Sequence, residues 1–245
     1  MKSVEMKCAL VCLLLLGSVA AWSDTHSKIE DKTGWDSCVA CAGGKSRNAS
    51  IATSPFQSPP SMDGASRDFY INGAAYSNAL WWKKLGAHNS AKNLKYDFWI
   101  YTSNNIWYAQ TLEFDAFQFV NGRIYMFGTQ CNYAAKVWDV WNAGAKSWHH
   151  TSVPCTKFAP KTWYHVTLTF HRTTDNKYMH YEDVRIQRAD QSKKIVADHT
   201  YHFNKAMPSG KTSWGDNMGV QFQIDIGKKG MEMQEWVDKV TLTVW

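Results

Sequence analysis

Long apolar runs, clustered basic residues and a helical repeat of apolar residues are all missing from this sequence. The longest apolar run, residues 8–16, is too short to span a bilayer. Basic residues occur in nothing longer than pairs such as Lys83-Lys84, so the formal net charge of +6 is spread over the chain. A nucleic-acid footprint would be clustered, and helices would show a 3.6-residue period over three turns. We therefore expect no membrane span, no nucleic-acid partner and no helical fold.

The first 21 residues have the layout of a secretory signal. Two lysines precede the apolar run, and small residues between Gly17 and Ala21 follow it. We expect residues 1–21 to be removed and the protein to be secreted, or periplasmic if the source is bacterial.

Cysteine is scarce after that segment. Cys38, Cys41, Cys131 and Cys155 remain, and four cysteines permit three disulfide connectivities. Export makes disulfides plausible, and local spacing favours Cys38–Cys41 with Cys131–Cys155. A redox motif at Cys38-Val-Ala-Cys41 would need a strand–helix unit around it, and a zinc site would need a second pair at similar spacing.

Residues 22–66 contain the glycine pair Gly43-Gly44, serines and prolines with little periodicity, and we expect an irregular N-terminal segment there. From residue 67 to residue 245 the pattern is almost entirely that of β-strands. Many short strands without helices indicate an all-β sandwich or barrel. The expected strands cover 67–72, 79–85, 94–102, 109–120, 123–130, 135–141, 162–172, 177–188, 194–203, 219–227 and 233–245.

Aromatic residues are abundant, with 13 Trp, 11 Tyr and 11 Phe. Aromatics favour strands, and exposed indoles can also stack on sugars. Trp81 and Trp82 point to opposite faces of one strand, as do Trp138 and Trp141, so at most one of each pair lies in the core. The other of each pair is a candidate for sugar stacking.

The strand at 109–120 carries two carboxylates, Glu113 and Asp115, in an otherwise apolar stretch. Strict alternation would separate its early apolar residues from Phe117 and Phe119. A β-bulge near Asp115-Ala116 would bring all of them to the core side and place Glu113, Asp115 and Gln118 together on the other face.

The following hairpin predicts the same arrangement. Asn121-Gly122 suits a two-residue type I′ turn, which pairs Val120 with Arg123 and Gln118 with Tyr125. Tyr125 would then share the face of Gln118, with Arg123 and Phe127 at its edge.

The E-x-D strand of Glu113 and Asp115 resembles the laminarinase-type glycoside hydrolases of the concanavalin A-like superfamily, whose motif is E-x-D-x-x-E. The strand at 162–169, Thr-Trp-Tyr-His-Val-Thr-Leu-Thr, is similar to the W-x-H-V-x-L strand of laminin-G-like and pentraxin-like jelly rolls, and 237–242 looks like their last strand. The resemblance implies a two-sheet antiparallel jelly roll over residues 67–245. It also implies that calcium is a possible ligand, although no Asp/Asn-rich loop has a recognisable set of calcium ligands.

In the hydrolases the resemblance would make Glu113 the nucleophile, Asp115 its partner and a third acid the proton donor. This chain has Gln118 in the third place, and an amide cannot act as a general acid or base. Retaining hydrolysis needs two carboxyls, one of them protonated. The substitution therefore favours binding over cleavage.

Histidines supply the alternatives. His165 or His171, with Tyr125, Arg123 and Gln118, has the residue types of a uronate lyase, and His165 joins Glu113 and Asp115 in the catalytic set if the protein is an enzyme. His149-His150 and His199/His202 lack a third metal ligand at suitable spacing, so we expect no metal site.

From the sequence we predict a secreted, monomeric polysaccharide-binding protein without catalytic activity. A glycoside hydrolase or polysaccharide lyase acting in the same groove is the first alternative, and an adhesion or envelope scaffold is the second. The expected ligand-binding residues are Glu113, Asp115, Gln118, Arg123, Tyr125 and Phe127.

Overall fold

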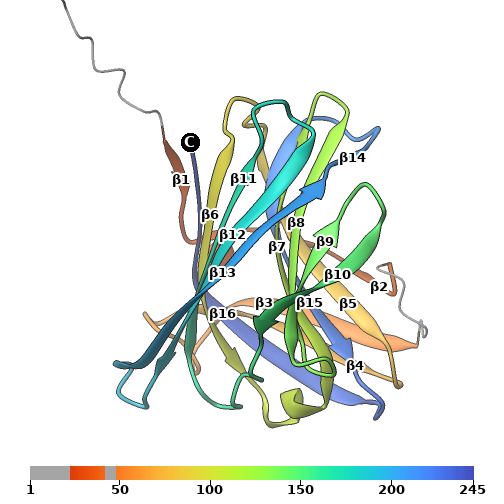
Figure 1. Cartoon of the computed structure of the whole chain (residues 1–245). Coiled ribbons are helices and arrows are strands. Elements are labelled where there is room, and N and C mark those ends of the chain that lie inside the picture. Colours follow the sequence, from red (N-terminus) through yellow and green to blue (C-terminus); the bar gives the residue numbers. More distant parts are fainter. Residues whose placement is uncertain (1–22, 42–47) are drawn as a thin grey trace, which may run out of the picture.

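Two antiparallel β-sheets packed face to face make up the protein in a computed structural model, which describes residues 23–41 and 48–245 (Figure 1). The expected signal segment 1–21 lies outside the described residues. Two short 3-10 helices, η1 (Ile29–Asp31) and η2 (Asn104–Tyr108), connect strands. No helix among the described residues is long and apolar enough to cross a membrane. The all-β prediction is confirmed.

The first sheet, sheet A, has β16 (Met231–Val244) near its centre. The short strand β1 (Asp24–His26) pairs with the end of β16, so that Asp24 faces Val244 and His26 faces Leu242. Sheet A follows the order β13 (Ile195–Pro208), β12 (Tyr178–Ala189), β11 (Tyr164–Arg172), β6 (Asn93–Thr102), β16, β4 (Ser66–Gly73) and β3 (Ala49–Gln57).

The second sheet, sheet B, has the carboxylate strand β7 (Ala109–Val120) at its centre, between β8 and β15. A short strand, β14 (Gly210–Lys211), pairs with the start of β8. Sheet B follows the order β10 (Ser147–Pro154), β9 (Val137–Asn142), β8 (Arg123–Asn132), β7, β15 (Asn217–Ile226), β5 (Asn78–Gly86) and β2 (Asp36–Val39).

The eleven expected strands are all present, with ends that differ by a few residues. The N-terminal segment differs from the prediction, because residues 22–66 contribute β1, β2 and β3 to the two sheets. Strand β10 was not expected. It follows the Asn142-Ala-Gly144 turn and carries His149-His150 instead of an apolar alternation.

The hairpin register of β7 and β8 is confirmed, but the predicted bulge is wrong. Val120 pairs with Arg123 and Gln118 with Tyr125, as the Asn121-Gly122 turn requires. From Thr111 to Val120, however, β7 pairs with β8 without any shift, and its pairing with β15 is also continuous past Asp115. Alternation is therefore strict through the whole carboxylate stretch.

Both expected disulfides are present in the structure. Cys38 and Cys41 are joined with Cα atoms 6.1 Å apart, and Cys131 and Cys155 with Cα atoms 5.6 Å apart. The second bridge ties β8 to the segment that follows β10. It therefore holds one end of the β9–β10 hairpin against the centre of sheet B.

An aromatic cluster fills the space between the sheets. Phe222 of β15 lies at its centre and contacts five rings whose centroids are 5.1–6.2 Å away. Every ring except Trp35 is completely buried. These rings are Trp35, Phe69, Tyr96, Phe98 and Phe114.

We predict that Phe222→Ala lowers the free energy of unfolding by about 3–5 kcal/mol, because it leaves a cavity among rings of both sheets. The matched control is Phe56→Ala, since the Phe56 side chain is 63% exposed, and we expect it to change stability by no more than about 0.5 kcal/mol. Denaturant unfolding of the two variants measures both values. Equal effects would contradict this description of the core.

Candidate functional site

Glu113 and Asp115 lie on the outer face of sheet B, directed away from the aromatic core. Strict alternation in β7 places them on the side opposite Leu112 and Phe114, which are completely buried in the core. Neighbouring strands add polar and aromatic side chains to the same face, according to their pairing with β7 and with each other. We call this surface the carboxylate face; its central residues are Trp82, Glu113, Asp115, Gln130, Asp139, Trp141, Trp148, His150, Gln221 and Gln223.

Gln118 does not share this face, contrary to the prediction. Because the bulge is missing, Gln118 points inward with Leu112 and Phe114, and its side chain is fully buried. Its Nε2 donates hydrogen bonds to the main-chain oxygens of His88 (2.6 Å) and Ala91 (3.1 Å). The glutamine therefore anchors the loop between β5 and β6, and it cannot reach a ligand that contacts Asp115.

The remaining expected ligand residues of β8 also lie on the inner side. The hydroxyl of Tyr125 donates to the main-chain oxygen of Asn176 at 2.8 Å, and the phenol ring is 1% exposed. Phe127 stacks on Phe170 between the sheets. Arg123 lies at the end of the strand, where its guanidinium donates to Ser209 at 2.8 Å. The prediction that Tyr125 and Phe127 lie beside the carboxylates is wrong.

His165, expected to join the carboxylates in an enzyme, lies on the other sheet. It occupies the outer face of sheet A, where its ring nitrogens contact Asp97 and Gln187 at 2.7 Å each and its ring stacks on Trp99. Burial lowers the pKa of His165, but the hydrogen bond to the half-buried Asp97 carboxylate outweighs this effect and raises it overall. The aromatic core separates His165 from Glu113, so the two cannot act on one bond.

The two carboxyl groups of the carboxylate face share a proton. Burial, followed by the charge of Asp115, raises the pKa of Glu113 well above its usual range. Burial also raises the pKa of Asp115 to about 7, while the hydrogen bond from Glu113 opposes this rise. Both shifts favour a proton held between the two carboxyl groups.

A side-chain amide and a main-chain N–H group donate hydrogen bonds to the carboxyl pair. Gln221 Nε2 lies 2.8 Å from Asp115 Oδ2 and 3.4 Å from Glu113 Oε1, and the amide of Thr129 donates to Asp115 Oδ1 at 3.1 Å. Asp115 thus accepts from both sides and is 1% exposed. Gln223 of β15, which pairs with Glu113, donates to Asp225. The Gln223 Oε1 atom has no partner among the described residues.

Indole rings flank the carboxyl pair on both sides. Asp115 pairs with Gln221 and Gln221 with Trp82, so Trp82 lies two strands away on one side. On the other side Trp141 pairs with Trp148, and their rings meet edge to face at 5.2 Å. All three indoles are half-buried. The predicted split of the tryptophan pairs is confirmed, since Trp81 and Trp138 are buried in the core.

Gly128 allows one indole to approach Asp115. Gly128 pairs directly with Asp115, and a Cβ atom at Gly128 would lie only 2.8 Å from Trp141 Cβ and 3.2 Å from Trp148 Cη2. The same position is 3.4 Å from Asp115 Oδ1. Because glycine leaves this space open, the Trp148 ring lies over β8 next to the carboxyl pair.

A histidine–aspartate pair, which the sequence analysis did not find, lies in the row of Glu113. His150 Nδ1 is 2.5 Å from Asp139 Oδ1, and Asp139 is completely buried. The amides of Gln130 and Asn132 donate to Asp139 Oδ2 at 2.7 and 2.8 Å. The His150 side chain is 65% exposed, so Asp139 orients an imidazole ring that a ligand can reach.

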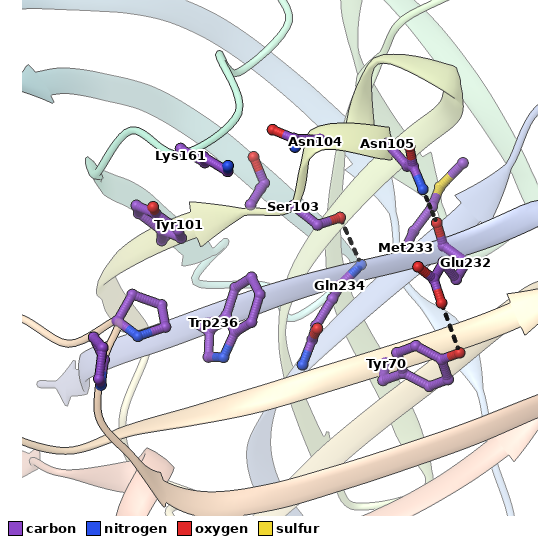
Figure 2. A pocket seen from close by; sticks show the side chains of 13 residues that line it. Tyr70, Tyr101, Ser103, Asn104, Asn105, Lys161, Glu232, Met233, Gln234 and Trp236 are labelled. Atoms are coloured by element: carbon purple, nitrogen blue, oxygen red, sulfur yellow. Dashed lines mark hydrogen bonds between the residues drawn. The ribbon is translucent and has the colours of Figure 1, made fainter.

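Sheet A has a separate pocket on its own outer face, with a volume of about 520 Å³ (Figure 2). Tyr70, Tyr101 and Trp236 contribute rings to it. Its polar groups bind each other, since Tyr70 donates to Glu232 at 3.3 Å and the Gln234 amide donates to the Ser103 hydroxyl at 3.1 Å. This pocket lies on the opposite side of the sandwich from the carboxylate face.

Comparisons with known proteins identify the fold. No profile of a known family matches the chain, and no curated protein matches it. Among solved structures, an alginate lyase from Aplysia kurodai superimposes with a TM-score of 0.51 and 10% identity, over 79% of this chain and 86% of that one. A family 11 carbohydrate-binding module from Clostridium thermocellum (TM-score 0.42, 11% identity, 90% and 94% covered) and arcelin-5, a lectin-like defence protein from Phaseolus vulgaris (0.42, 9%, 91% and 97%), are also similar.

The fold is that of a concanavalin A-like jelly roll, as predicted. At 10% identity the likeness to the alginate lyase extends to the arrangement of the sheets and not to the activity. Function must therefore be argued from the carboxylate face itself.

The protonation of the carboxyl pair predicts how stability depends on pH. An aspartate in an unfolded chain has a pKa of about 3.9, whereas the pKa of Asp115 in the folded protein is about 7. Between these values the unfolded chain loses its proton first, so the free energy of unfolding falls as the pH rises from about 4 to about 7. We expect the Glu113→Gln/Asp115→Asn variant to reduce this fall, by on the order of a few kcal/mol.

Denaturant unfolding at a series of pH values measures the effect. Asp63→Asn is the control, because Asp63 is an exposed aspartate in the loop between β3 and β4, away from the carboxylate face. A double variant with the same pH dependence as the wild type would show that the pair is not protonated in the folded protein.

Proposed function

We propose that the protein binds a polysaccharide across the carboxylate face. The observation that carries this proposal is the row formed by Trp148, Trp141, Asp115, Gln221 and Trp82, which extends over six neighbouring strands from β10 to β5. Binding sites for small ligands combine aromatic surfaces with a few fixed polar groups. Here half-buried indoles can stack on sugar rings on both sides of a polar centre.

The polar centre suits hydroxyl groups. Gln130, Gln221 and Gln223 each carry a donor and an acceptor, as sugar hydroxyls do. The Gln223 Oε1 atom has no partner among the described residues, and a hydroxyl that donates to it would remove the cost of an unpaired buried acceptor.

The charges of the face favour a neutral polysaccharide. Carboxyl groups of Glu113, Asp115, Asp139 and Asp225 lie on it, and no arginine of the described strands points to this side. A uronate polymer would bring further negative charge to a face that already carries four carboxyl groups. Neutral sugars avoid this repulsion.

The arrangement of the carboxyls supports binding without hydrolysis. Retaining glycosidases hold their two carboxyls about 5–5.5 Å apart, and inverting enzymes hold them farther apart. Glu113 and Asp115 are close enough for each to affect the pKa of the other, and Gln221 contacts both. The third position of the hydrolase motif, Gln118, points into the core.

The two disulfides and the signal-like first segment are consistent with our proposal that the protein acts outside the cytoplasm, as a monomer.

We predict that Trp148→Ala and Trp82→Ala each weaken polysaccharide binding by about tenfold, because each removes a stacking surface. The protein is first screened on a glycan array that includes neutral and uronate polymers, and the affinity for the best ligand is then measured by calorimetry. The matched control is Trp236→Ala, which removes an indole from the sheet A pocket of Figure 2. Affinity lost only with the control, or no ligand on the array, would contradict the proposal.

A second candidate function is cleavage of the bound polysaccharide, and the His150–Asp139 pair is the observation that favours it. An exposed imidazole held by a buried carboxylate can act as a general base. Incubation of the identified ligand with the protein, followed by assays for new reducing ends and for unsaturated uronate, distinguishes the two functions. We expect no product. Product that disappears with His150→Asn or Glu113→Gln would replace binding with catalysis.

A further inference from the structure

Three metal-ligating side chains from distant parts of the chain meet at one end of sheet A. Asp24 and His26 belong to β1, and His88 lies in the loop between β5 and β6. The Nε2 atoms of the two histidines are 3.1 Å apart, and Asp24 Oδ2 is 3.6 Å from His26 Nε2. Asp24 Oδ2 is also 3.6 Å from the Nδ1 atom of the His88 ring. None of these contacts belongs to the carboxylate face.

These separations match those of ligand atoms around a tetrahedral ion. Zinc binds histidine nitrogen at about 2.0–2.1 Å and carboxylate oxygen at about 2.0–2.2 Å, so two ligand atoms of one tetrahedral zinc lie about 3.3–3.5 Å apart. The measured 3.1 and 3.6 Å lie on either side of that range. Two imidazoles and one carboxylate also form the type of ligand set that leaves a fourth position open for water.

The backbone segments that carry these three side chains, β1 and the β5–β6 loop, are both held in place by hydrogen bonds. His26 pairs with Leu242 in the sheet, which fixes its backbone. The loop that carries His88 is held by Gln118, which donates to the main-chain oxygens of His88 and Ala91, and by Arg172, which donates to those of Asn89 and Ala91. A site whose ligands are already ordered loses little conformational entropy when the ion binds.

The cluster is partly shielded from water, and a carboxylate lies beside its two imidazoles. The side chains of His26 and His88 are 18% and 15% exposed, and their rings meet edge to face at 4.9 Å. Neutral imidazole is the form that ligates metal, and the carboxylate of Asp24 offsets part of the charge of a divalent ion.

We propose that Asp24, His26 and His88 bind one Zn²⁺ ion, with water in the fourth position. The ion would connect β1 of sheet A to the β5–β6 loop, which leads from sheet B to sheet A. This proposal is independent of the carbohydrate function. It differs from the expectation from sequence that no metal site is present, and spacing alone does not indicate these three residues, which are separated by up to 64 positions in the chain.

A second cluster offers an internal control. His171, His180 and Glu182 lie on the outer face of sheet A, and their ligand atoms are also close together. The two imidazoles are stacked, with an angle of 22° between the rings and centroids 4.7 Å apart. His171 Nδ1 is already hydrogen-bonded to Glu182 at 2.7 Å. Stacked rings direct their nitrogens side by side and not toward one central point, so we assign the zinc to the first cluster.

The test uses the whole protein without a histidine tag, freed of metal by dialysis against a chelator. Calorimetric titration with Zn²⁺ is expected to show one tight equivalent, and Co²⁺ is expected to give the absorption bands of a four-coordinate ion. His26→Ala and His88→Ala should each weaken zinc binding by at least about tenfold, while His171→Ala should leave it unchanged. Zinc should also raise the unfolding temperature of the wild type and not that of His26→Ala.

Asp24→Asn tests the site without removing a ring. It keeps the size of the side chain and should weaken zinc binding with an unchanged unfolding temperature of the metal-free protein. Wild-type zinc affinity in both His26→Ala and His88→Ala, zinc affinity lost only in His171→Ala, or no zinc binding at all would each overturn the proposal.

Discussion

Uninterrupted pairing on both sides of β7 is the constraint on which the site depends. Successive residues of a strand point to opposite faces, and β7 has no irregularity between Thr111 and Val120 to change that order on the β8 side. Between Thr111 and Val120, odd-numbered residues of β7 therefore point to the outer face of sheet B, and even-numbered residues point to the core. Glu113 and Asp115 lie outside with Trp82 and Trp148 around them, whereas Gln118 lies inside and holds a loop.

Burying Glu113 and Asp115 together lowers the stability of the fold, but it gives the carboxylate face fixed hydrogen-bonding groups. Two acids placed together away from water cannot both ionise, so one proton stays between Glu113 and Asp115. Gln221 and the Thr129 amide supply the donors that make the remaining charge acceptable. The face therefore presents a preformed mixture of donors and acceptors, and a ligand does not need to order it first. Such preorganisation is what allows hydroxyl groups to compete with water for binding.

The features predicted correctly from the sequence are those that depend on residues close together in the chain, namely strand periodicity and turn type. The type I′ turn at Asn121-Gly122 set the register of β7 and β8 correctly, and the alternation of Trp81 and Trp82 assigned the right indole to the surface. The bulge was wrong because Phe117 and Phe119 were assumed to belong to the core. They lie outside it and pack with Trp214 in a small apolar cluster on the outer face. An apolar side chain does not by itself identify the interior when both faces of a strand are covered.

Long-range pairing accounts for what could not be predicted. Nothing near Asp24 or His88 indicates that β1 pairs with β16 and brings these residues together. The turn after Trp141 did contain a signal, because the order Asp139-x-Trp141 is mirrored by Trp148-x-His150 across it. An antiparallel hairpin with this register must place tryptophan opposite tryptophan and histidine opposite aspartate. The signal was missed because β10 has none of the apolar alternation of a half-buried strand.

The position of β10 has a consequence for motion. It is the last strand of sheet B and is hydrogen-bonded along its length to β9 alone, whereas Trp82 and Gln221 stand on strands paired on both sides. Edge hairpins open at a lower free-energy cost than central strands. One wall of the carboxylate face, bearing Trp148 and His150, therefore separates from its sheet at a lower free-energy cost than the wall bearing Trp82 and Gln221.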